Sequence, residues 1–533
     1  MNDSLKKTIT PVLALALALT LLAGCGVFTL TEEERGELEA EEVAAAQSIG
    51  QELAATYAAD RVFSLNCVSD SPFNPYRTTS AWNKVVAMLV YENLVEQDRS
   101  FEAQPNLITA WETEDGKTWI FSVDTSRSFH DGGSMTAADA VYSLDLARGY
   151  ESQYETRFRH VRDTYTLDSE QFVVVLSQVN WRFYELMDIP CIEYGTGYTD
   201  RPPGTGPYTF SASGRYLRLD SAHPLAAQMP LTTIYLKEYG AAVDILQAFE
   251  DSYLDLVIND PNGISSMGYS STNIIKYVDT TSLHYIGYNV TSGLFAQGML
   301  RSVMTYGIDR ASIVSEVMQG AGTAAVFPIS PQSELYPEAL AKTLAYTESG
   351  FRTALENLGA TDLDLDGTLE FSGQRYTVDF IVCSDSGVKV SIARAIASSL
   401  RGFGIDVSLR ELGYDDYIKE LEKGSFDMYY AEVRLCGDWD LRYLLESGAE
   451  LNYGNVRDAA LDGYLQDFIS SPPEQQADRM EQLCRYIAQS APITPICFEK
   501  SQVLYHRGVL SGLEPTQDNV FHNMQNWTVE LTV

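Results

Sequence analysis

The sequence predicts an α/β protein that folds into two or more lobes, and two observations support this prediction. The chain has 533 residues, 45% of them hydrophobic and 11% aromatic, which is enough for more than one hydrophobic core. Between residues 376 and 430, strand and helix patterns alternate in the order YTVDFIVC, a helix over 387–402, IDVSLREL, a helix over 414–423, and FDMYY. Strands that alternate with helices favour an open, partly parallel sheet.

The N-terminal residues have the pattern of an export leader followed by a tether. Two lysines precede an apolar run over 12–23, which is too short to span a bilayer and is typical of a signal peptide. The run ends in Leu-Ala-Gly-Cys25, which resembles a bacterial lipobox. We therefore expect residues 1–24 to be a lipoprotein signal peptide and Cys25 to carry a lipid that anchors the chain to the outer face of the cell membrane. The alternative is an ordinary secretory signal with an incidental cysteine. The acidic stretch 25–59 is interpreted as a tether.

Charge and motif content argue against several functional classes. The net charge of −36 makes binding to nucleic acid phosphates unfavourable. The six histidines show no metal-ligand spacing, and the chain has no Walker A, G-x-S-x-G or G-x-G-x-x-G motif, so we expect no enzyme activity, no cofactor and no metal. The other cysteines show no C-x-x-C pairing, and the sequence alone does not pair them.

Two local motifs suggest chemistry but are better explained as turns. Phe129-His130-Asp131-Gly132 places a histidine beside an aspartate, yet adjacent residues on a tight turn rarely face each other, so a structural turn is favoured over catalysis. The sequence DLDLDG over 362–367 begins like an EF-hand loop, but the twelfth position is Gly373 instead of a bidentate carboxylate. An acidic turn is favoured there, with weak cation binding as the alternative.

The segment 61–148 contains the most ordered series of local signals. A strand is predicted over 61–68, followed by a proline-bounded loop and by helical spacing over 80–90. Asp115-Gly116-Lys117 predicts a hairpin turn into a strand with one apolar face. That face carries Trp119, Phe121 and Val123. Thr136 is then predicted as a helix N-cap, with Asp139 at the capping-box position.

The chain resembles the extracytoplasmic solute-binding proteins of ABC importers, in the family that binds oligopeptides, dipeptides and nickel complexes (bacterial solute-binding protein family 5). Within residues 91–144, the segments YENLV, PNL, AWE, DGKTWIFSV and FHDGGSMTAADAVYSL carry the resemblance. GTGPY at 204–208, the end of a helix in IDR at 308–310, and APITPI at 491–496 follow in the family's order. The resemblance covers about 60–533.

This resemblance implies a two-lobed periplasmic-binding-protein-like fold (type II), with the ligand enclosed between α/β lobes joined by a hinge. Lobe 1 would comprise 60–290 plus 505–533, with an extra subdomain near 91–180. Lobe 2 would comprise 291–504.

The implied function is that of a substrate-binding lipoprotein. It would capture a small solute, most often an oligopeptide or dipeptide in this family, and deliver it to an ABC permease whose ATPase subunits supply the energy. We expect a monomer. The alternatives are a ligand-sensing lipoprotein for signalling, a binder of a non-peptide solute such as a metal chelate, and an extracytoplasmic hydrolase.

The stretch 426–446 is where ligand contacts are predicted. Its pattern is a strand that turns at Cys436-Gly437 and opens into a helix with Asp438 as N-cap. In peptide-binding relatives, a W-x-x-D-Y segment at this place offers its aspartate to the ligand's α-ammonium. Asp438 and Trp439 align with that aspartate and the aromatic residue after it.

Two arginines flank this aspartate and leave its partner open. Arg434 stands near the position of the missing tryptophan, where a guanidinium could pair with a ligand carboxylate or neutralise Asp438. Arg442 follows Asp438 by four residues and could form an i,i+4 pair with it. The predicted ligand-binding residues are therefore Arg434, Asp438, Trp439 and Arg442, and the partner of Asp438 is a helix end, an arginine or a ligand amine.

Overall fold

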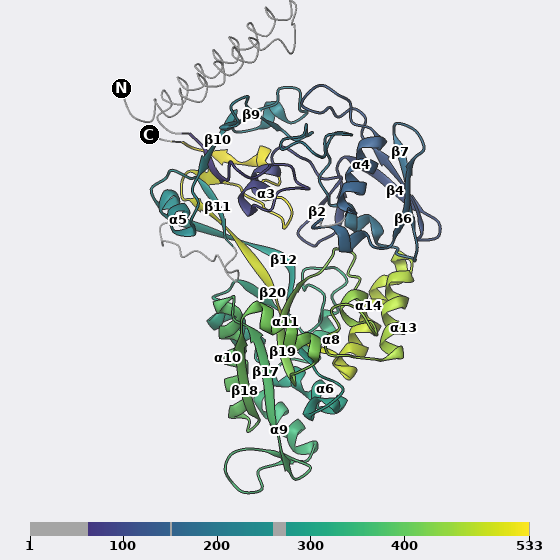
Figure 1. The fold of residues 1–533 in the computed structure, drawn as a ribbon, viewed down its shortest axis with the longest axis vertical. Helices are drawn as coiled ribbons and strands as arrows, with labels where there is room; N and C mark the ends of the chain where they lie inside the picture. The colour runs from purple at the N-terminus through teal and green to yellow at the C-terminus, as the bar shows by residue number, and fades with distance from the viewer. Residues whose placement is uncertain (1–61, 150–151, 260–272, 532–533) are drawn as a thin grey trace, which may run out of the picture. The chain divides into compact units, whose positions relative to one another are not determined.

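A four-stranded sheet begins the fold in the computed structural model, which describes residues 62–149, 152–259 and 273–531 (Figure 1). The signal peptide, Cys25 and the acidic tether lie outside the described residues. The strand order is β1 (Ser64–Cys67), β10 (Thr233–Glu238), β9 (Tyr216–Leu219) and β8 (Tyr208–Phe210). Helix α3 (Ala81–Ala87) contacts β1, and its N-cap is Ser80, whose side chain accepts the Asn83 N–H. The predicted first strand and first helix are both confirmed.

A second four-stranded sheet is antiparallel and lies in the segment where the sequence predicts a hairpin. Its order is β4 (Ile108–Thr113), β5 (Thr118–Val123), β7 (Gln171–Leu176) and β6 (Val161–Thr166). The predicted apolar face of β5 is buried. Helix α4 (Ala137–Ala147) packs against this sheet, and the Thr136 N–H donates to the Asp139 carboxylate at 2.8 Å. The predicted hairpin and capping box are confirmed.

A seven-stranded sheet contains the alternating segment 376–430 (Figure 1). Its order is β11 (Leu256–Asn259), β20 (Ile493–His506), β12 (Asn273–Tyr288), β19 (Met428–Arg434), β17 (Thr377–Cys383) and β18 (Asp406–Leu412), with β13 (Gly322–Ala324) beside β20. Strand β17 is parallel to both β18 and β19, while the other pairs are antiparallel. Helices α10 (Gly387–Gly402) and α11 (Tyr414–Lys423) connect the parallel strands. The predicted partly parallel α/β sheet is confirmed.

The long strands β12 and β20 run side by side, and the register of their pairing shifts at two places, of which the first bears on the site. The register shifts between Asp279 and Leu283, where β12 has extra residues. At this bulge the Thr281 N–H donates to Gln517 Oε1 at 2.6 Å, and Thr281 Oγ1 donates to the Leu435 carbonyl at 2.7 Å. The bulge therefore holds the end of β19 and the C-terminal segment against each other.

The other α-helices and the short strands lie outside these three sheets. The helices are α5 (Ala242–Glu250), α6 (Gly298–Gly307), α7 (Arg310–Ser312), α8 (Glu338–Thr343), α9 (Glu348–Asn357), α12 (Arg442–Leu445), α13 (Ala459–Ser470) and α14 (Pro473–Ser490). The short strands are β2 (Val95–Gln97), β3 (Ala103–Pro105), β14 (Ala360–Thr361), β15 (Glu370–Phe371), β16 (Gln374–Arg375), β21 (Leu510–Ser511) and β22 (Thr528–Val529). Within the described ranges, no helix has both the length and the apolarity that a membrane crossing needs.

The predicted helix start at Asp438 is wrong. Helix α12 begins only at Arg442. Trp439 adopts a φ of 55°, which lies in the left-handed region and breaks helical geometry, and the Asp438 carboxylate accepts the Asp440 N–H at 3.2 Å instead of capping a helix. The loop 435–441 therefore separates strand and helix.

The predicted lobe boundaries at 290 and 504 remain predictions. One sheet carries strands from both sides of each boundary, since β12 ends at Tyr288 and β20 runs across residue 504.

Candidate functional site

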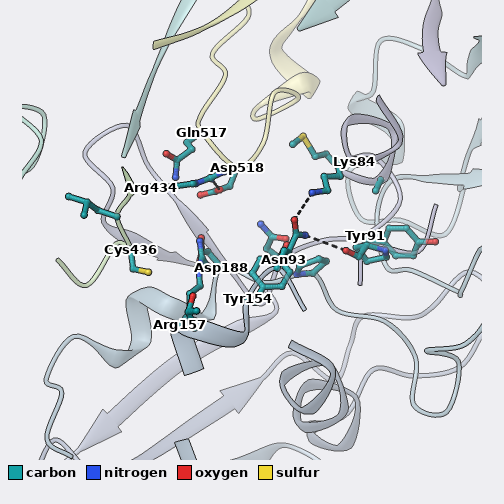
Figure 2. Close-up of a pocket in the computed structure, with 17 residues that line it drawn as sticks. Lys84, Tyr91, Asn93, Tyr154, Arg157, Asp188, Arg434, Cys436, Gln517 and Asp518 are labelled. Atoms are coloured by element: carbon teal, nitrogen blue, oxygen red, sulfur yellow. Dashed lines mark hydrogen bonds and ion pairs between the residues drawn. The ribbon is translucent and has the colours of Figure 1, made fainter. Parts of the chain in front are cut away.

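A cavity of about 400 Å³ is lined by charged groups of both signs. Its walls come from five separate stretches of sequence, within 75–93, 153–157, 188–190, 434–436 and 517–518. Figure 2 shows these side chains gathered around one space. Cavities of this size enclose small ligands in many binding proteins.

Local structure explains how each charged group reaches the cavity. Lys84 lies on α3, and Arg157 lies on a single 3₁₀ turn over Glu155–Phe158. Asp188 directly follows another 3₁₀ turn, Arg434 is the last residue of β19, and Asp518 is held beside it by the C-terminal segment at the β12 bulge. Lys84 and Arg157 therefore project from helical turns, Arg434 projects from a strand end, and Asp188 and Asp518 project from loops.

Two ion pairs occupy one side of the cavity. Arg157 Nη1 lies 2.5 Å from Asp188 Oδ1, and both side chains are largely buried. Arg434 Nη2 lies 3.1 Å from Asp518 Oδ1, with the arginine side chain 56% exposed and the aspartate 14% exposed (Figure 2). Burial, and then the negative charge of Asp188, raise the pKa of Asp518 to about 6. The second carboxylate oxygens of Asp188 and Asp518 are buried without a hydrogen-bond partner among the described residues.

Lys84 faces the cavity from the opposite side. Its Nζ donates to Gln153 Oε1 at 2.6 Å. Burial, followed by the positive charge of Arg434, lowers the pKa of Lys84. Tyr154 adds an aromatic wall, and the Arg157 guanidinium lies 5.4 Å from its ring centre.

Of the predicted ligand-binding residues, only Arg434 lines the cavity. Asp438 lines a side pocket of about 30 Å³, which shares Thr156, Arg157 and Cys436 with the cavity and has room for about one water or one ammonium group. Asp438 Oδ2 accepts a hydrogen bond from Asn180 Nδ2 at 2.8 Å.

The electrostatics of Asp438 are set by its neighbours. Asp438 is buried, with an exposed fraction of 3%. Burial and the negative charge of Asp440 raise the pKa of Asp438 to about 6, although Asn180 favours the ionised form. A cationic ligand group at this position would find an acceptor whose protonation changes near pH 6.

The structure places Trp439 and Arg442 in the interior. Trp439 is 0% exposed and packs edge-to-face on Phe101 and Phe498, at centroid distances of 5.8 and 6.2 Å. The predicted pair between Arg442 and Asp438 is wrong, since Arg442 pairs with Asp440 through Nε–Oδ1 at 2.9 Å and Nη2–Oδ2 at 2.8 Å. Arg442 cannot form the helical i,i+4 pair with Asp438, because α12 begins only at Arg442 and residues 438–441 are not helical.

Sequence reasoning missed four charged residues of the cavity: Lys84, Arg157, Asp188 and Asp518. Asp188 had a usable signal, because a carboxylate flanked by Leu-Met and Ile-Pro is expected to be buried and paired. The others carry no local signal, since they meet only through long-range folding.

The Phe129–Gly132 turn is structural, as predicted. His130 Nε2 lies 2.8 Å from the Gly206 carbonyl, and His130 Nδ1 accepts the Gly204 N–H at 3.3 Å. His130 therefore holds the GTGPY turn through two hydrogen bonds. Burial lowers the pKa of His130.

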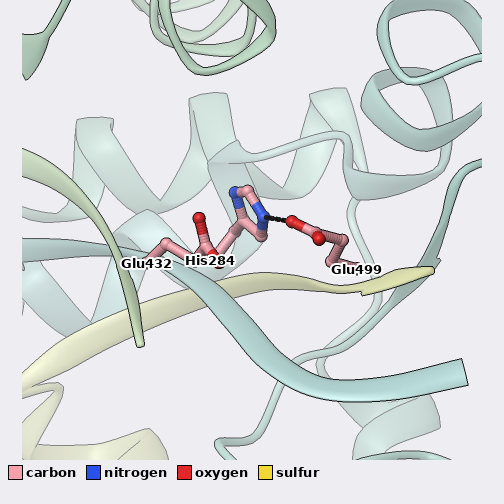
Figure 3. A group of neighbouring side chains, drawn as sticks. All are labelled: His284, Glu432 and Glu499. Carbon is pink, nitrogen blue, oxygen red and sulfur yellow. Dashed lines mark hydrogen bonds and ion pairs between the residues drawn. The ribbon is translucent and has the colours of Figure 1, made fainter. Parts of the chain in front are cut away.

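Two groups of side chains have the composition of metal ligands. His284, Glu432 and Glu499 converge from β12, β19 and β20 (Figure 3). The ring nitrogens of His284 already have partners, with Nε2 3.0 Å from Glu499 Oε2 and Nδ1 2.8 Å from Tyr430 Oη. Glu432 forms an ion pair with Lys389. Hydrogen bonds and an ion pair account for this geometry without a cation.

The acidic turn at 362–367 forms the second group, together with Glu370. Asp362 accepts the N–H groups of Asp366 and Gly367, and Glu370 accepts the Leu363 N–H at 2.8 Å. These carboxylates stabilise the turn that carries them, as the sequence predicts for an acidic turn.

The family described as bacterial extracellular solute-binding proteins, family 5 Middle, matches residues 102–440. Oligopeptide-binding protein AppA of Bacillus subtilis (strain 168) is 23% identical over 488 residues, covering 85% of this chain and 89% of AppA. Di/tripeptide-binding protein 3 of Pseudomonas aeruginosa (strain UCBPP-PA14) is 22% identical over 515 residues, covering 86% and 94% of the two chains.

Solved structures agree with the fold. The structure of B. subtilis AppA in complex with a nonapeptide matches with a TM-score of 0.61 at 20% identity, over 88% of this chain and 98% of AppA. NikA from Brucella suis in complex with Fe(III)-EDTA matches with a TM-score of 0.71 at 16% identity, over 88% and 100% of the two chains. The two-lobed α/β fold predicted from the sequence is confirmed.

Proposed function

Because the chain belongs to the bacterial extracellular solute-binding proteins of family 5, we propose that it is the substrate-binding lipoprotein of an ABC importer and that its solute is a peptide. Proteins of this family bind solutes outside the cytoplasm for transport, and they are not enzymes. The proposal adds the solute class, the lipid anchor at Cys25 and a monomeric state to this family assignment.

The cavity supports a peptide solute through its two signs of charge. Peptides carry an ammonium at one end and a carboxylate at the other, and binding sites match each with the opposite charge. The cavity offers the carboxylates of Asp188 and Asp518, and the cations Lys84, Arg157 and Arg434. Both curated relatives described above are named as peptide-binding proteins.

The capture step needs only binding and closure. A solute in the cavity contacts residues from the N-terminal half, at 84 and 157, and the end of β19 at 434. A ligand that contacts both sides favours the conformation in which both sides are close. The permease and ATPase subunits would then take over the solute and hydrolyse ATP.

An anionic metal chelate is the second candidate solute. The observation in its favour is the excess of cations in the cavity lining, where three basic side chains face two carboxylates. NikA, one of the structural relatives, was solved with Fe(III)-EDTA. A chelate of this kind would leave the carboxylates of Asp188 and Asp518 paired only with their arginines.

Native mass spectrometry of the full chain, purified without refolding, tests the proposed solute. We expect a retained peptide mass, and a rise in Tm when peptides are added back to the stripped protein. A retained metal chelate with no response to peptides would contradict the peptide proposal, and turnover in a general peptidase assay would contradict a binding role.

The lipid anchor and the monomeric state need separate measurements. In cells labelled with a radioactive fatty acid, we expect label in the wild-type chain and none in Cys25→Ser, with both chains exported. Light scattering behind a sizing column should give the mass of one chain. Label in Cys25→Ser would contradict lipidation at this residue.

A further inference from the structure

We propose that Lys84 and Arg434 bind a carboxylate of the solute between them, which makes a solute carboxylate a requirement for capture. This inference rests on the proposed function and specifies the chemistry of the solute that the cavity takes. It would hold for the C-terminal carboxylate of a peptide and for a carboxylate of a metal chelate.

The basic side chains of the cavity are unequally paired. Arg157 is buried and pairs with Asp188 at 2.5 Å, so its charge is neutralised within the protein. In the described part of the chain, Lys84 has no ion-pair partner and donates to the neutral Gln153 oxygen at 2.6 Å. A partly buried ammonium without a carboxylate is unfavourable unless something else supplies the negative charge.

Arg434 has donors left for a second carboxylate. A guanidinium has five N–H donors and can pair with a carboxylate through two of them. Arg434 uses Nη2 toward Asp518 Oδ1, at 3.1 Å, and its side chain is 56% exposed. Donors on the remaining nitrogens are therefore accessible to a second anion.

Lys84 and Arg434 converge on the same cavity. Figure 2 shows Lys84 and Arg434 entering the cavity from opposite sides, with the Lys84 ammonium turned toward the interior. The two charges interact, since Arg434 contributes to the lowering of the Lys84 pKa. Two like charges that face each other across a cavity are stabilised by an anion placed between them, which also raises the pKa of Lys84 toward its ordinary value.

The test compares matched probes on the full, ligand-stripped chain. One probe is a mixture of random tripeptides to pentapeptides with free C-termini, and the second is the same mixture with C-terminal amides. A third is Fe(III)-EDTA, an anionic chelate without a peptide bond. Binding is measured by the rise in Tm and by calorimetry for peptides that are retained.

The variants are Lys84→Met and Arg434→Met, which remove charge and keep an apolar stem. Lys117→Met and Arg485→Met are the matched controls, because Lys117 is an exposed lysine outside the cavity and Arg485 is 54% exposed in a single ion pair with Glu481. Lys84→Arg tests rescue by a conservative change. The unliganded Tm of each variant shows whether it folds.

We expect wild type and both controls to prefer the free-acid peptides over the amides by roughly 10- to 100-fold, the contribution of hydrogen bonds to a charged group. Lys84→Met and Arg434→Met should lose most of this preference by weakening acid binding, and Lys84→Arg should restore part of it.

Two outcomes separate this inference from the proposed function. If acids and amides bind equally well and Lys84→Met changes neither, the inference is overturned while the peptide proposal stands. If peptides do not bind but Fe(III)-EDTA does, and its binding requires Lys84 and Arg434, the inference holds and the peptide proposal fails. If none of the carboxylate-bearing probes raises Tm, the inference is overturned.

Discussion

The side-chain amide of Asn180 donates a 2.8 Å hydrogen bond to the carboxylate of Asp438, which lies 258 residues later in the chain. Neighbouring contacts reinforce this link, since the Trp181 N–H donates to the Ile469 carbonyl and Arg442 donates to Gln178 at 2.6 Å. The segment 178–182, which follows β7, thus contacts the loop after β19 through Asp438, α12 through Arg442 and α13 through Ile469. Asp438 is therefore a structural contact between distant segments as well as a predicted ligand contact.

The raised pKa of Asp438 predicts how the effect of its substitution on the free energy of unfolding varies with pH. Its folded pKa of about 6 is above the ordinary value of 3.8, so the unfolded chain loses this proton first as pH rises. Ionised Asp438 therefore costs stability above pH 6, and this cost is absent below about pH 4. In urea unfolding, we expect Asp438→Asn to gain about 1–3 kcal/mol relative to wild type between pH 4 and pH 7. Groups that do not interact with Asp438 cancel in this difference, whereas Asp440, whose charge contributes to the raised pKa of Asp438, responds to the substitution. A difference that does not vary with pH would show that burial does not perturb Asp438.

A ligand role for Asp438 can be separated from its structural role. Asp438→Ala removes both the carboxylate and the contact with Asn180, whereas Asn180→Ala removes the contact and keeps the carboxylate. If Asp438 binds the solute ammonium, peptides should raise the Tm of Asn180→Ala but not that of Asp438→Ala. Asn180→Ala should lose about 1–3 kcal/mol without ligand, because it leaves the buried carboxylate of Asp438 without its donor. An equal response of both variants to peptides would assign Asp438 to structure alone.

Trp439 should behave as a core residue. It is fully buried against Phe101 and Phe498, so Trp439→Ala should lower the free energy of unfolding by about 3–5 kcal/mol. Trp439→Phe should cost less than about 2 kcal/mol, because the indole Nε1 has no hydrogen-bond partner among the described residues and its removal relieves a buried donor. Chemical denaturation measures the free energy of unfolding of both variants. Unchanged stability of Trp439→Ala, combined with weaker solute binding, would instead favour the predicted ligand contact.

Arg182 should be among the most sensitive charged positions. It lies 2.8 Å from Glu185, which is 0% exposed, and also contacts Glu102 and Gln476. Arg182→Met should cost about 3–5 kcal/mol, because it leaves Glu185 buried without its cation. The double variant Arg182→Met with Glu185→Gln should recover part of the loss in the same denaturation assay, whereas the exposed Arg485→Met should lose little. No recovery in the double variant would mean that Arg182 acts through packing and not through charge.

The parts of the fold that sequence predicted well are those set by local patterns. Helix α10 spans the predicted residues 387–402, and the alternation in β19 places Tyr429 and Tyr430 in different hydrophobic cores on opposite faces of the sheet. Side-chain period and capping residues act within a few positions, so they can be read directly.

The candidate site was only partly predictable, for physical reasons. The left-handed backbone at Trp439, which delays α12, carries no sequence signal because tryptophan rarely adopts it. The cavity joins Lys84 to Arg434 and Asp518 through the β12 bulge and the C-terminal segment, and such contacts depend on the completed sheet. Arg434 was found because it stood at a motif position, while Lys84 stands on an ordinary helix.

The β12 bulge has a consequence for partly made or clipped copies of the protein. Gln517 and Asp518 line the cavity, and Gln517 Oε1 accepts the Thr281 N–H at the bulge. A chain that ends before residue 517 would expose Arg434 without its carboxylate and leave one wall of the cavity open. A clipped chain of this kind would keep the three basic side chains of the cavity and lose one of its two carboxylates, so its cavity would be more positive than that of the intact chain.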